Sequence, residues 1–236
     1  MIQLSGNEVG IMEFRPIAFA KTDFKDKFGI PRQSGRVKQL VGEIHFLPEY
    51  SNPEAFRGLE NFSHMWVIFD FSGSHRSKFS STVRPPRLGG NKRVGVFSSR
   101  SPFRPNPIGL SCVKIEKIEK NAQNNIVITV SGIDLLDGTP ILDVKPYIPY
   151  CDCVHDATGS FAQENKDHRL EVDFPEEFLK LIPSEKRTAL INCIRDDPRP
   201  AYQNDPNRIY KMKFDVFDVE MKIFDGKASI VGIKPL

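Results

Sequence analysis

The chain has 236 residues, of which 39% are hydrophobic and 27% charged, and its formal net charge is +3. This is the usage of an ordinary globular protein, so it excludes a disordered chain and a fibrous protein. No apolar run approaches the ~18–20 residues of a membrane span, and the N-terminus has no basic segment followed by an apolar one, so we expect a cytoplasmic protein without a membrane partner.

Short apolar runs rich in Val, Ile and Phe dominate the first two thirds of the chain and predict β-strands. They cover residues 9–19, 37–47, 64–71, 93–97, 110–118, 126–133 and 140–144. Residues 120–125 and the pair Asp137-Gly138 separate neighbouring runs and predict hairpin turns of an antiparallel sheet. The sequence has no βαβ alternation, and no G-x-G-x-x-G motif follows a predicted strand. We therefore expect a barrel or sandwich and no Rossmann-type sheet.

Positive charge is concentrated in residues 71–115, which contain no Asp or Glu. The cations there are Arg76, Lys78, Arg84, Arg87, Lys92, Arg93, Arg100, Arg104 and Lys114. Such a patch attracts phosphates and is typical of a nucleic-acid surface, although a solvated face without a ligand is the alternative. Prolines and glycines stiffen residues 84–110, and stiff loops hold guanidinium groups ready for anions.

Composition shifts at residues 151–166, so we place a boundary there and expect a β-rich domain at 1–153 and a small α+β domain at 154–236. Pro175 predicts the start of a short helix, and Ser184 is the expected N-cap of a second one. The second helix has an apolar stripe for packing, at Ala189, Leu190, Cys193 and Ile194. Residues 208–217, 219–224 and 228–233 predict a small sheet with a hairpin at 225–226.

That second helix ends at Asp196-Asp197 before Pro198, where the helix dipole favours cations over acids. Two explanations remain open, a tight Asp–Arg pair with Arg199 and a solvent-exposed turn.

The four cysteines, at 112, 151, 153 and 193, are too few and scattered for a disulfide framework and fit a reducing compartment. Cys151-x-Cys153-x-His155 departs from the spacing of zinc sites, so a loop at a domain edge is favoured over a metal, and we expect no metal. His64 lies in an apolar run beside Trp66, which favours a core histidine over a catalytic one.

Seven fragments, in order along nearly the whole chain, resemble the TrmO family. They are Pro31-Arg-Gln33, Gly58-Leu-Glu-x-Phe-Ser-His-x-Trp66, Thr82-Val-Arg-Pro-Pro-Arg-Leu-Gly-Gly90, Arg100-Ser-x-Phe-Arg-Pro-Asn-Pro-Ile-Gly109, Asp134-x-x-Asp-Gly-Thr-Pro140, Asp143-x-Lys-Pro-Tyr147 and Asp197-Pro-Arg-Pro-Ala-Tyr202. The resemblance implies a mainly β fold, an antiparallel, non-Rossmann, YaeB-like barrel that binds S-adenosylmethionine, followed by a small α+β domain.

The resemblance also implies an activity: S-adenosylmethionine-dependent methylation of N6 of threonylcarbamoyl-adenosine at tRNA position 37, beside the anticodon. The implied partners are the tRNA anticodon arm and a second copy of the chain, with the cofactor near the subunit interface. Two alternatives remain, a noncatalytic RNA-binding module of the same fold and a methyltransferase for another acceptor.

Matching motifs imply the cofactor contacts Pro31, Arg32, Gln33, Ser72, Gly73, Arg100, Leu110, Asp134, Leu135, Leu136 and Asp137. The Ser72-Gly73 pair departs from the His-Gln pair of many family members. An arginine suits the cofactor's carboxylate, and an aspartate suits its hydroxyl or amino groups. Asp137 has a competing interpretation as the first residue of its turn.

Methyl transfer depends mainly on positioning, and a base would activate the weakly nucleophilic N6. The catalytic residue stays unknown; Asp137, Asp143 and the substrate's own carboxylate are the candidates. The residues predicted to contact tRNA are Arg84, Arg87, Arg93, Arg104, Lys145 and Arg199, among which Arg84, Arg87 or Arg104 would also suit the threonyl carboxylate.

Overall fold

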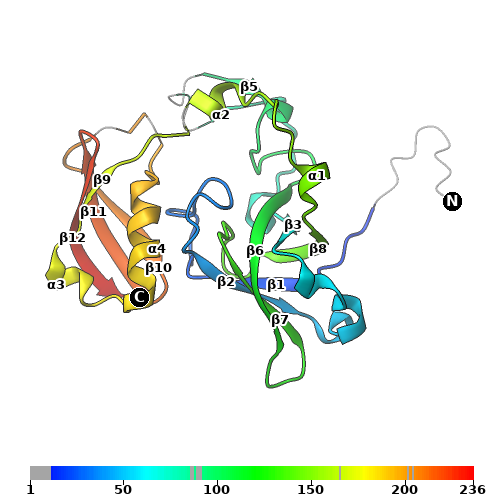
Figure 1. The fold of residues 1–236 in the computed structure, drawn as a ribbon. Helices are drawn as coiled ribbons and strands as arrows, with labels where there is room; N and C mark the ends of the chain where they lie inside the picture. Colours follow the sequence, from blue (N-terminus) through cyan, green and yellow to red (C-terminus); the bar gives the residue numbers. More distant parts are fainter. Residues whose placement is uncertain (1–11, 86–87, 89–91, 165, 201, 204) are drawn as a thin grey trace.

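The structure, a computed structural model, describes residues 12–85, 88, 92–164, 166–200, 202–203 and 205–236. Figure 1 shows a barrel and, beside it, a smaller sheet with one long helix. The predicted fold, an antiparallel barrel followed by a small α+β part, is confirmed. No helix in the described part of the chain is long and apolar enough to cross a membrane.

Six strands close the barrel in the order β1-β2-β7-β6-β3-β8, and every neighbouring pair is antiparallel. The strands are β1 (Ala18–Lys21), β2 (Val41–Phe46), β3 (His64–Asp70), β6 (Ile108–Lys120), β7 (Ile126–Ser131) and β8 (Pro140–Pro146). Alternate side chains point inward, as Met65, Val67 and Phe69 of β3 do. Opposite Phe69, β6 carries Gly109, where a Cβ would overlap the phenyl ring.

The strands predicted at 37–47, 64–71, 110–118, 126–133 and 140–144 are confirmed with shifted ends. The strand predicted at 9–19 is wrong over most of its described part, because β1 begins only at Ala18; residues 9–11 lie outside the described residues. Pro16, which has no N–H to donate to a sheet, precedes that start. The strand predicted at 93–97 shrinks to β5 (Val94–Gly95), which pairs with β4 (Thr82–Val83) before a 3₁₀ turn begins.

The hairpin predicted at 120–125 is confirmed, since it joins the antiparallel strands β6 and β7. The hairpin predicted at Asp137-Gly138 is wrong, because β7 and β8 are not neighbours in the barrel. The two residues do form a turn, but their N–H groups donate to the carbonyls of Phe24 at 2.9 Å and Ala20 at 2.8 Å. Barrel closure thus brings β8 beside β1 and β3.

The C-terminal sheet has the order β10-β11-β12-β9. Its strands are β9 (Glu171–Asp173), β10 (Ile209–Phe214), β11 (Phe217–Phe224) and β12 (Lys227–Pro235), and its helices are α3 (Glu176–Leu179) and α4 (Ser184–Arg195). The predicted hairpin at 225–226 and the buried stripe of α4 are confirmed. Strand β9, parallel to β12, was not predicted. Ser184 is not the N-cap; Pro183 is, and the Ser184 hydroxyl donates to Glu185.

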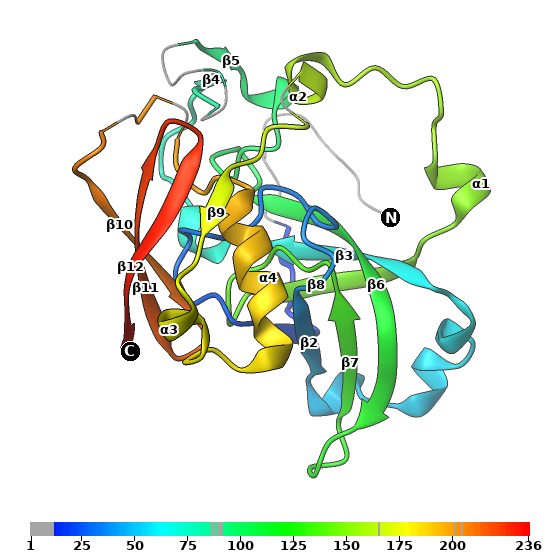
Figure 2. The ribbon, with the colours of Figure 1, turned by 60° about the vertical axis from the view of Figure 1, so that its left-hand side comes forward.

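Short elements connect these parts. They are the helices α1 (Pro149–Asp152) and α2 (Ser160–Glu164) and the 3₁₀ turns η1 (Pro48–Tyr50), η2 (Pro53–Phe56), η3 (Leu59–Asn61), η4 (Ser72–Ser74) and η6 (Val96–Ser98). Figures 1 and 2 both show α2 near β5, at the top of the view.

Barrel and C-terminal sheet share one hydrophobic core. Phe24 and Phe214, both completely buried, meet edge to face with ring centroids 5.7 Å apart. Lys186 of α4 lies between Asp23 at 2.7 Å and Asp215 at 2.8 Å. The boundary at 153/154 stays a prediction, and the shared core shows that the two parts are firmly docked.

Candidate functional site

A cavity of about 600 Å³ opens at the end of the barrel where β3 finishes and β6 begins. We call it the cofactor cavity. It brings together nearly all residues predicted to contact the cofactor: Pro31, Arg32, Gln33, Ser72, Gly73, Arg100, Leu110, Asp134, Leu135 and Leu136. The volume lies within the roughly 300–1,000 Å³ typical of ligand sites.

Gln33 joins two of the arginines in the wall of the cofactor cavity. Its amide nitrogen donates to the carbonyl of Arg32 at 2.6 Å, and its amide oxygen accepts a hydrogen bond from Arg100. Arg100 is otherwise exposed, so this contact holds its guanidinium at the cavity mouth. A guanidinium held in place suits a ligand carboxylate, because less conformational freedom is lost on binding.

Asp134, just beyond β7, contributes a carboxylate to the cavity wall. Its Oδ1 accepts a hydrogen bond from the Ser111 hydroxyl at 2.6 Å. Burial raises the pKa of Asp134 to about 6, although the Ser111 hydroxyl and the positive charge of Arg100 oppose this. At neutral pH such a carboxyl is mostly ionised and still basic enough to accept a proton.

Ser111 itself was missed by the sequence analysis. It is 1% exposed and lies in β6 directly after Leu110. A hydroxyl in an otherwise apolar strand was the signal available, since buried polar groups require a partner.

Ser72 and Gly73 lie exposed on η4, at the far wall. Lys27 braces this turn, because its ammonium donates to the carbonyl of Gly73 at 2.7 Å and the hydroxyl of Ser74 at 3.1 Å. The departure from the family's His-Gln pair therefore leaves main chain and a small hydroxyl facing the cavity.

Leu110 presents an apolar side chain at the cavity, with 51% of its surface exposed. It points outward from β6, in alternation with the buried Gly109 and Ser111. An apolar group beside Arg100 and Asp134 completes the set that an amino acid joined to a nucleoside requires: a cation, an anion and a surface for the base.

Asp137 does not line the cofactor cavity. Its Oδ1 accepts the N–H of Thr22 at 2.9 Å, and its Oδ2 pairs with Lys25 at 2.8 Å. Partial burial opposes the shift, but the hydrogen bonds from Lys25 and Thr22 and the lysine charges hold the pKa of Asp137 below its usual value. Its carboxylate stabilises the turn at 137–138, so it is poorly suited to the two roles predicted for it, cofactor contact and base.

Asp143, the other predicted base, lies on β8 and lines neither the cofactor cavity nor the groove described next. Its Oδ1 accepts the N–H of Val144 at 2.9 Å, and its Oδ2 pairs with Lys145 at 2.9 Å. It therefore lies outside both hollows, although the strand register places it in one row with Leu110, across Ile68 of β3.

A larger hollow of about 1830 Å³, the basic groove, adjoins the cofactor cavity. Strands β4 and β5, the loop after η6 and helix α2 form its walls. Its cations are Arg32, Arg36, Arg76, Lys78, Arg84, Arg93, Arg100 and Arg104. Among the described lining residues there is no Asp or Glu, so the groove attracts polyanions.

Exposed aromatic rings interrupt the positive charge of the basic groove. Phe97 is 74% exposed and Phe79 is 63% exposed, and both line the groove. The guanidinium of Arg76 lies 3.7 Å from the ring centre of Phe103. Aromatic faces in a cationic groove are platforms for stacking unpaired bases.

The predicted tRNA contacts divide into three groups. Arg84, Arg93 and Arg104 line the basic groove, whereas Arg87 lies outside the described residues. Lys145 is exposed but lies on β8, paired with Asp143. Arg199 is only 8% exposed, and its Nε donates to Asp197 at 3.1 Å, so its guanidinium is not available to a surface ligand.

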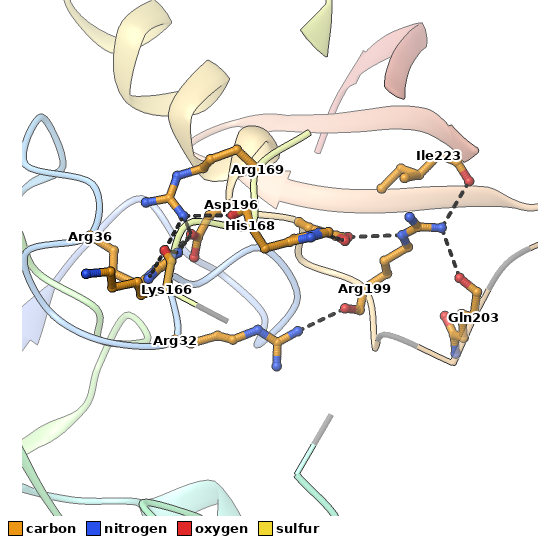
Figure 3. A network of polar contacts seen from close by, with 10 residues as sticks. Arg32, Arg36, Lys166, His168, Arg169, Asp196, Arg199, Gln203 and Ile223 are labelled. Carbon is orange, nitrogen blue, oxygen red and sulfur yellow. Dashed lines mark hydrogen bonds and ion pairs between the residues drawn. The ribbon is translucent and has the colours of Figure 1, made fainter. Parts of the chain in front are cut away.

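The acids after α4 are buried, which excludes the solvent-exposed turn and confirms the Asp–Arg pair. Figure 3 shows how this network reaches the cofactor cavity: the carbonyl of Arg199 accepts a hydrogen bond from Arg32 at 2.9 Å, and Asp196 pairs with Arg36 at 2.6 Å. The network was not foreseen, because its members come from segments about 160 residues apart.

Two minor sequence hypotheses concern cysteine and histidine side chains. Cys151 lies in α1, not in a loop, and Cys153 Sγ is 3.7 Å from His155 Nδ1. No three potential metal ligands come together among the described residues. His64 is not a core residue: it is half-buried on the outer face of β3, where Nδ1 lies 2.8 Å from the Ser63 hydroxyl.

Two family matches cover most of the chain. Residues 19–153 match the family described as the tRNA-methyltransferase O N-terminal domain, and residues 167–236 match the TrmO C-terminal domain.

Individual relatives match along almost their whole length. The chain is 37% identical over 231 residues to tRNA (adenine(37)-N6)-methyltransferase of Escherichia coli (strain K12), covering 94% of this chain and 98% of the relative. It is 39% identical to a putative S-adenosylmethionine-dependent methyltransferase, RcsF, of Pseudomonas aeruginosa, covering 86% and 89%. A crystal structure of TrmO from P. aeruginosa is similar with a TM-score of 0.78 at 30% identity, covering 97% of this chain and 99% of that one.

Proposed function

The chain belongs to the TrmO family and is an S-adenosylmethionine-dependent tRNA (adenine(37)-N6)-methyltransferase, and from this premise we propose that the cofactor cavity binds S-adenosylmethionine while the basic groove binds the anticodon arm. The observation that carries this proposal is that ten of the eleven predicted cofactor contacts line a single cavity. Asp137 is the one predicted contact that does not line the cavity.

The residues of the cofactor cavity fit the functional groups of S-adenosylmethionine. Arg100 would bind its carboxylate, Asp134 would accept from an amino or hydroxyl group, and Leu110 would cover the adenine. Main chain at 31–33, 72–73 and 135–136 would supply the remaining contacts. When bound, the cofactor supplies an electrophilic methyl group.

For the acceptor we propose N6 of threonylcarbamoyl-adenosine, as the family resemblance implies. Its threonyl carboxylate would be bound by an arginine of the basic groove, with Arg104 favoured because it lines both the groove and the cofactor cavity. Arg104 also donates to the carbonyl of Ser99 at 3.0 Å, which fixes its direction. A guanidinium held in this way distinguishes a carboxylate-bearing adenosine from plain adenosine.

For the base we propose Asp134 in place of Asp137 and Asp143. It lines the cofactor cavity and burial raises its pKa to about 6, so its carboxylate would accept the proton from N6. Such a base would contribute on the order of 10²–10⁴-fold, and positioning of the acceptor by the groove would contribute the larger part.

Arg84 and Arg93 would bind the phosphates of the anticodon arm, and Phe79 and Phe97 would stack on unpaired bases of the loop. Lys145 and Arg199 are left out of this surface for the reasons of position and burial given above. We retain Arg87 from the sequence analysis, on its place in the acid-free segment alone.

We also retain the homodimer and the cytoplasmic location as proposals. Ile108, 38% exposed, and Leu110, 51% exposed, form an apolar rim at the cofactor cavity that a second copy would cover. Free cysteines and a tRNA substrate support a reducing compartment. Sedimentation of the intact protein would measure its mass, and a monomer at micromolar concentration would contradict the dimer.

Mass spectrometry of tRNA nucleosides tests the proposed acceptor. The protein would be incubated with S-adenosylmethionine and either tRNA carrying threonylcarbamoyl-adenosine or the same transcript without the modification. We expect a nucleoside heavier by one methyl group only from the first. Methylation of both, or of another base, would contradict the acceptor, and RNA binding without turnover would support the noncatalytic alternative.

A further inference from the structure

The loop at residues 30–36, which we call the cofactor loop, carries Arg32 and Gln33 into the cofactor cavity but contains no helix or strand. Its shape therefore depends on contacts at its two sides. On the barrel side, Ser34 Oγ accepts the N–H of Cys112 at 3.0 Å and Gly35 N–H donates to Gly132 at 2.8 Å. On the cavity side, the Gln33 amide oxygen accepts a hydrogen bond from Arg100. Two further attachments, made by Arg32 and Arg36, reach the C-terminal part.

The first attachment is an ion pair between Arg36 and Asp196. Arg36 Nε donates to Asp196 Oδ1 at 2.7 Å, and a terminal nitrogen lies 2.6 Å from the same oxygen. The aspartate side chain is 6% exposed and the arginine 22% exposed. An ion pair this sheltered is screened little by salt or water, unlike a surface pair.

The second attachment runs through Arg199. Arg32 donates to the Arg199 carbonyl at 2.9 Å, and that residue is itself fixed by Asp197, whose Oδ1 accepts from Arg199 Nε at 3.1 Å. Asp197 Oδ2 lies 2.9 Å from His168 Nε2, and its side chain is 2% exposed. Figure 3 shows His168 and Arg32 both beside Arg199, with a dashed line from Arg32 to the Arg199 carbonyl.

The position of the two acids suggests a purpose beyond local stability. They follow the last turn of α4, where a negative charge is unfavourable because it lies at the negative end of the helix dipole. Asp197 also has a φ of 55°, a left-handed conformation that Asp tolerates better than most residues but less well than Gly. Their ion pairs offset these costs and hold Arg36, which is part of the cofactor loop, and Arg199, whose carbonyl accepts from Arg32 of that loop.

We infer that Asp196 and Asp197 are positioning residues for S-adenosylmethionine binding: through Arg36 and Arg199 they hold the cofactor loop in its binding shape. The C-terminal part thereby sets cofactor affinity without touching the cofactor. This inference rests on the proposed function of the cofactor cavity.

Calorimetric titration of the full-length protein with S-adenosylmethionine tests it. In Asp196→Asn and Asp197→Asn, which preserve shape and remove charge, we expect about 3- to 30-fold weaker binding, the range of coupling through a packed network. Asparagine tolerates the positive φ at 197. KM for the cofactor should rise in proportion, with kcat at saturating cofactor changed less than about twofold.

Lys186→Met provides the matched control. It removes a more exposed ion-pair cluster between the same two parts, with Asp23 and Asp215, that lies outside the cofactor cavity and the basic groove. Its cofactor affinity should stay within about twofold of the parent. Equal weakening in Lys186→Met would mean that general docking of the two parts matters, and would overturn the positioning role.

A double variant tests whether Asp196 affects the cofactor loop through Arg36. If Asp196 acts through Arg36, then Arg36→Met combined with Asp196→Asn should weaken binding no more than the worse single variant, whereas independent effects would multiply. Should an Asn variant fail to fold, Arg36→Met alone carries the test from the loop side. No binding by the parent would refute the cofactor cavity; binding by the parent with unchanged affinity in the variants would refute the inference.

Discussion

The cofactor cavity and the basic groove share a wall but are built on opposite principles. In the cavity, Asp134, Gln33 and Arg100 are bonded to neighbouring groups of the protein, so their geometry is set before a ligand arrives. In the groove, the rings of Phe79 and Phe97 and the guanidinium of Arg93 face solvent, Phe97 with 74% of its surface exposed. A site of the first kind depends on the placement of single atoms, and one of the second kind depends on total charge and area.

Replacement of the cavity carboxylate is expected to have the largest effect. Asp134→Asn removes the proposed base and one proposed cofactor contact without changing shape, so at saturating S-adenosylmethionine kcat should fall on the order of 10²–10⁴-fold while tRNA affinity stays constant. Single-turnover methylation of modified tRNA measures this. If instead Asp143→Asn loses activity and Asp134→Asn keeps it, the base was assigned to the wrong carboxyl.

Arg100→Ala should weaken S-adenosylmethionine binding about 10- to 100-fold, since hydrogen bonds to charged groups contribute about 1.5–3 kcal/mol. The loss should vary little with salt, because the guanidinium is fixed and acts at short range. Calorimetry at two salt concentrations measures both. Arg100→Lys keeps the charge but not the fork and should recover only part of the affinity; full recovery would show that charge alone matters here.

Arg93→Ala tests whether the basic groove binds tRNA through its total charge. Its guanidinium donates to Thr82 Oγ1 at 2.9 Å and otherwise faces solvent in the groove. We expect a few-fold loss of tRNA affinity at low salt, a slope of log affinity against log salt that is smaller by about 1, and unchanged cofactor binding. Arg93→Lys should keep the slope. Fluorescence anisotropy with labelled tRNA measures these affinities. A larger loss of tRNA affinity at high salt than at low salt would contradict the phosphate contact.

The smallest effect concerns pH. Because Asp134 must be ionised to accept a proton and its pKa is about 6, kcat/KM should fall as the pH drops through about 6. In Ser111→Ala the carboxylate loses a stabilising hydrogen bond, so its pKa rises and this limb of the profile moves to higher pH. At pH 8 both proteins should be nearly equal. A shift to lower pH would contradict the role given to the hydroxyl.

The barrel strands were predictable because their alternation is local, as in β3 and β7. The hairpin at 137–138 was not, because pairing of β8 with β1 is decided by barrel closure, which sequence spacing does not reveal. The same limit applied to the site. Motifs identified Asp134 and Arg199 as important, but the pKa of the one and the burial of the other depend on residues brought from distant segments.

The shared core affects how the protein folds during synthesis and how it unfolds. Phe24 is completely buried against Phe214, and Gly29, with a φ of 97°, lies against Met212 so closely that a Cβ would overlap it. In a nascent chain that has completed only its barrel, the apolar surfaces of Phe24 and Gly29 would stay exposed to solvent until the last strands are synthesised. Heating should therefore melt the protein in one cooperative transition, and a fragment ending near residue 153 should be prone to aggregate.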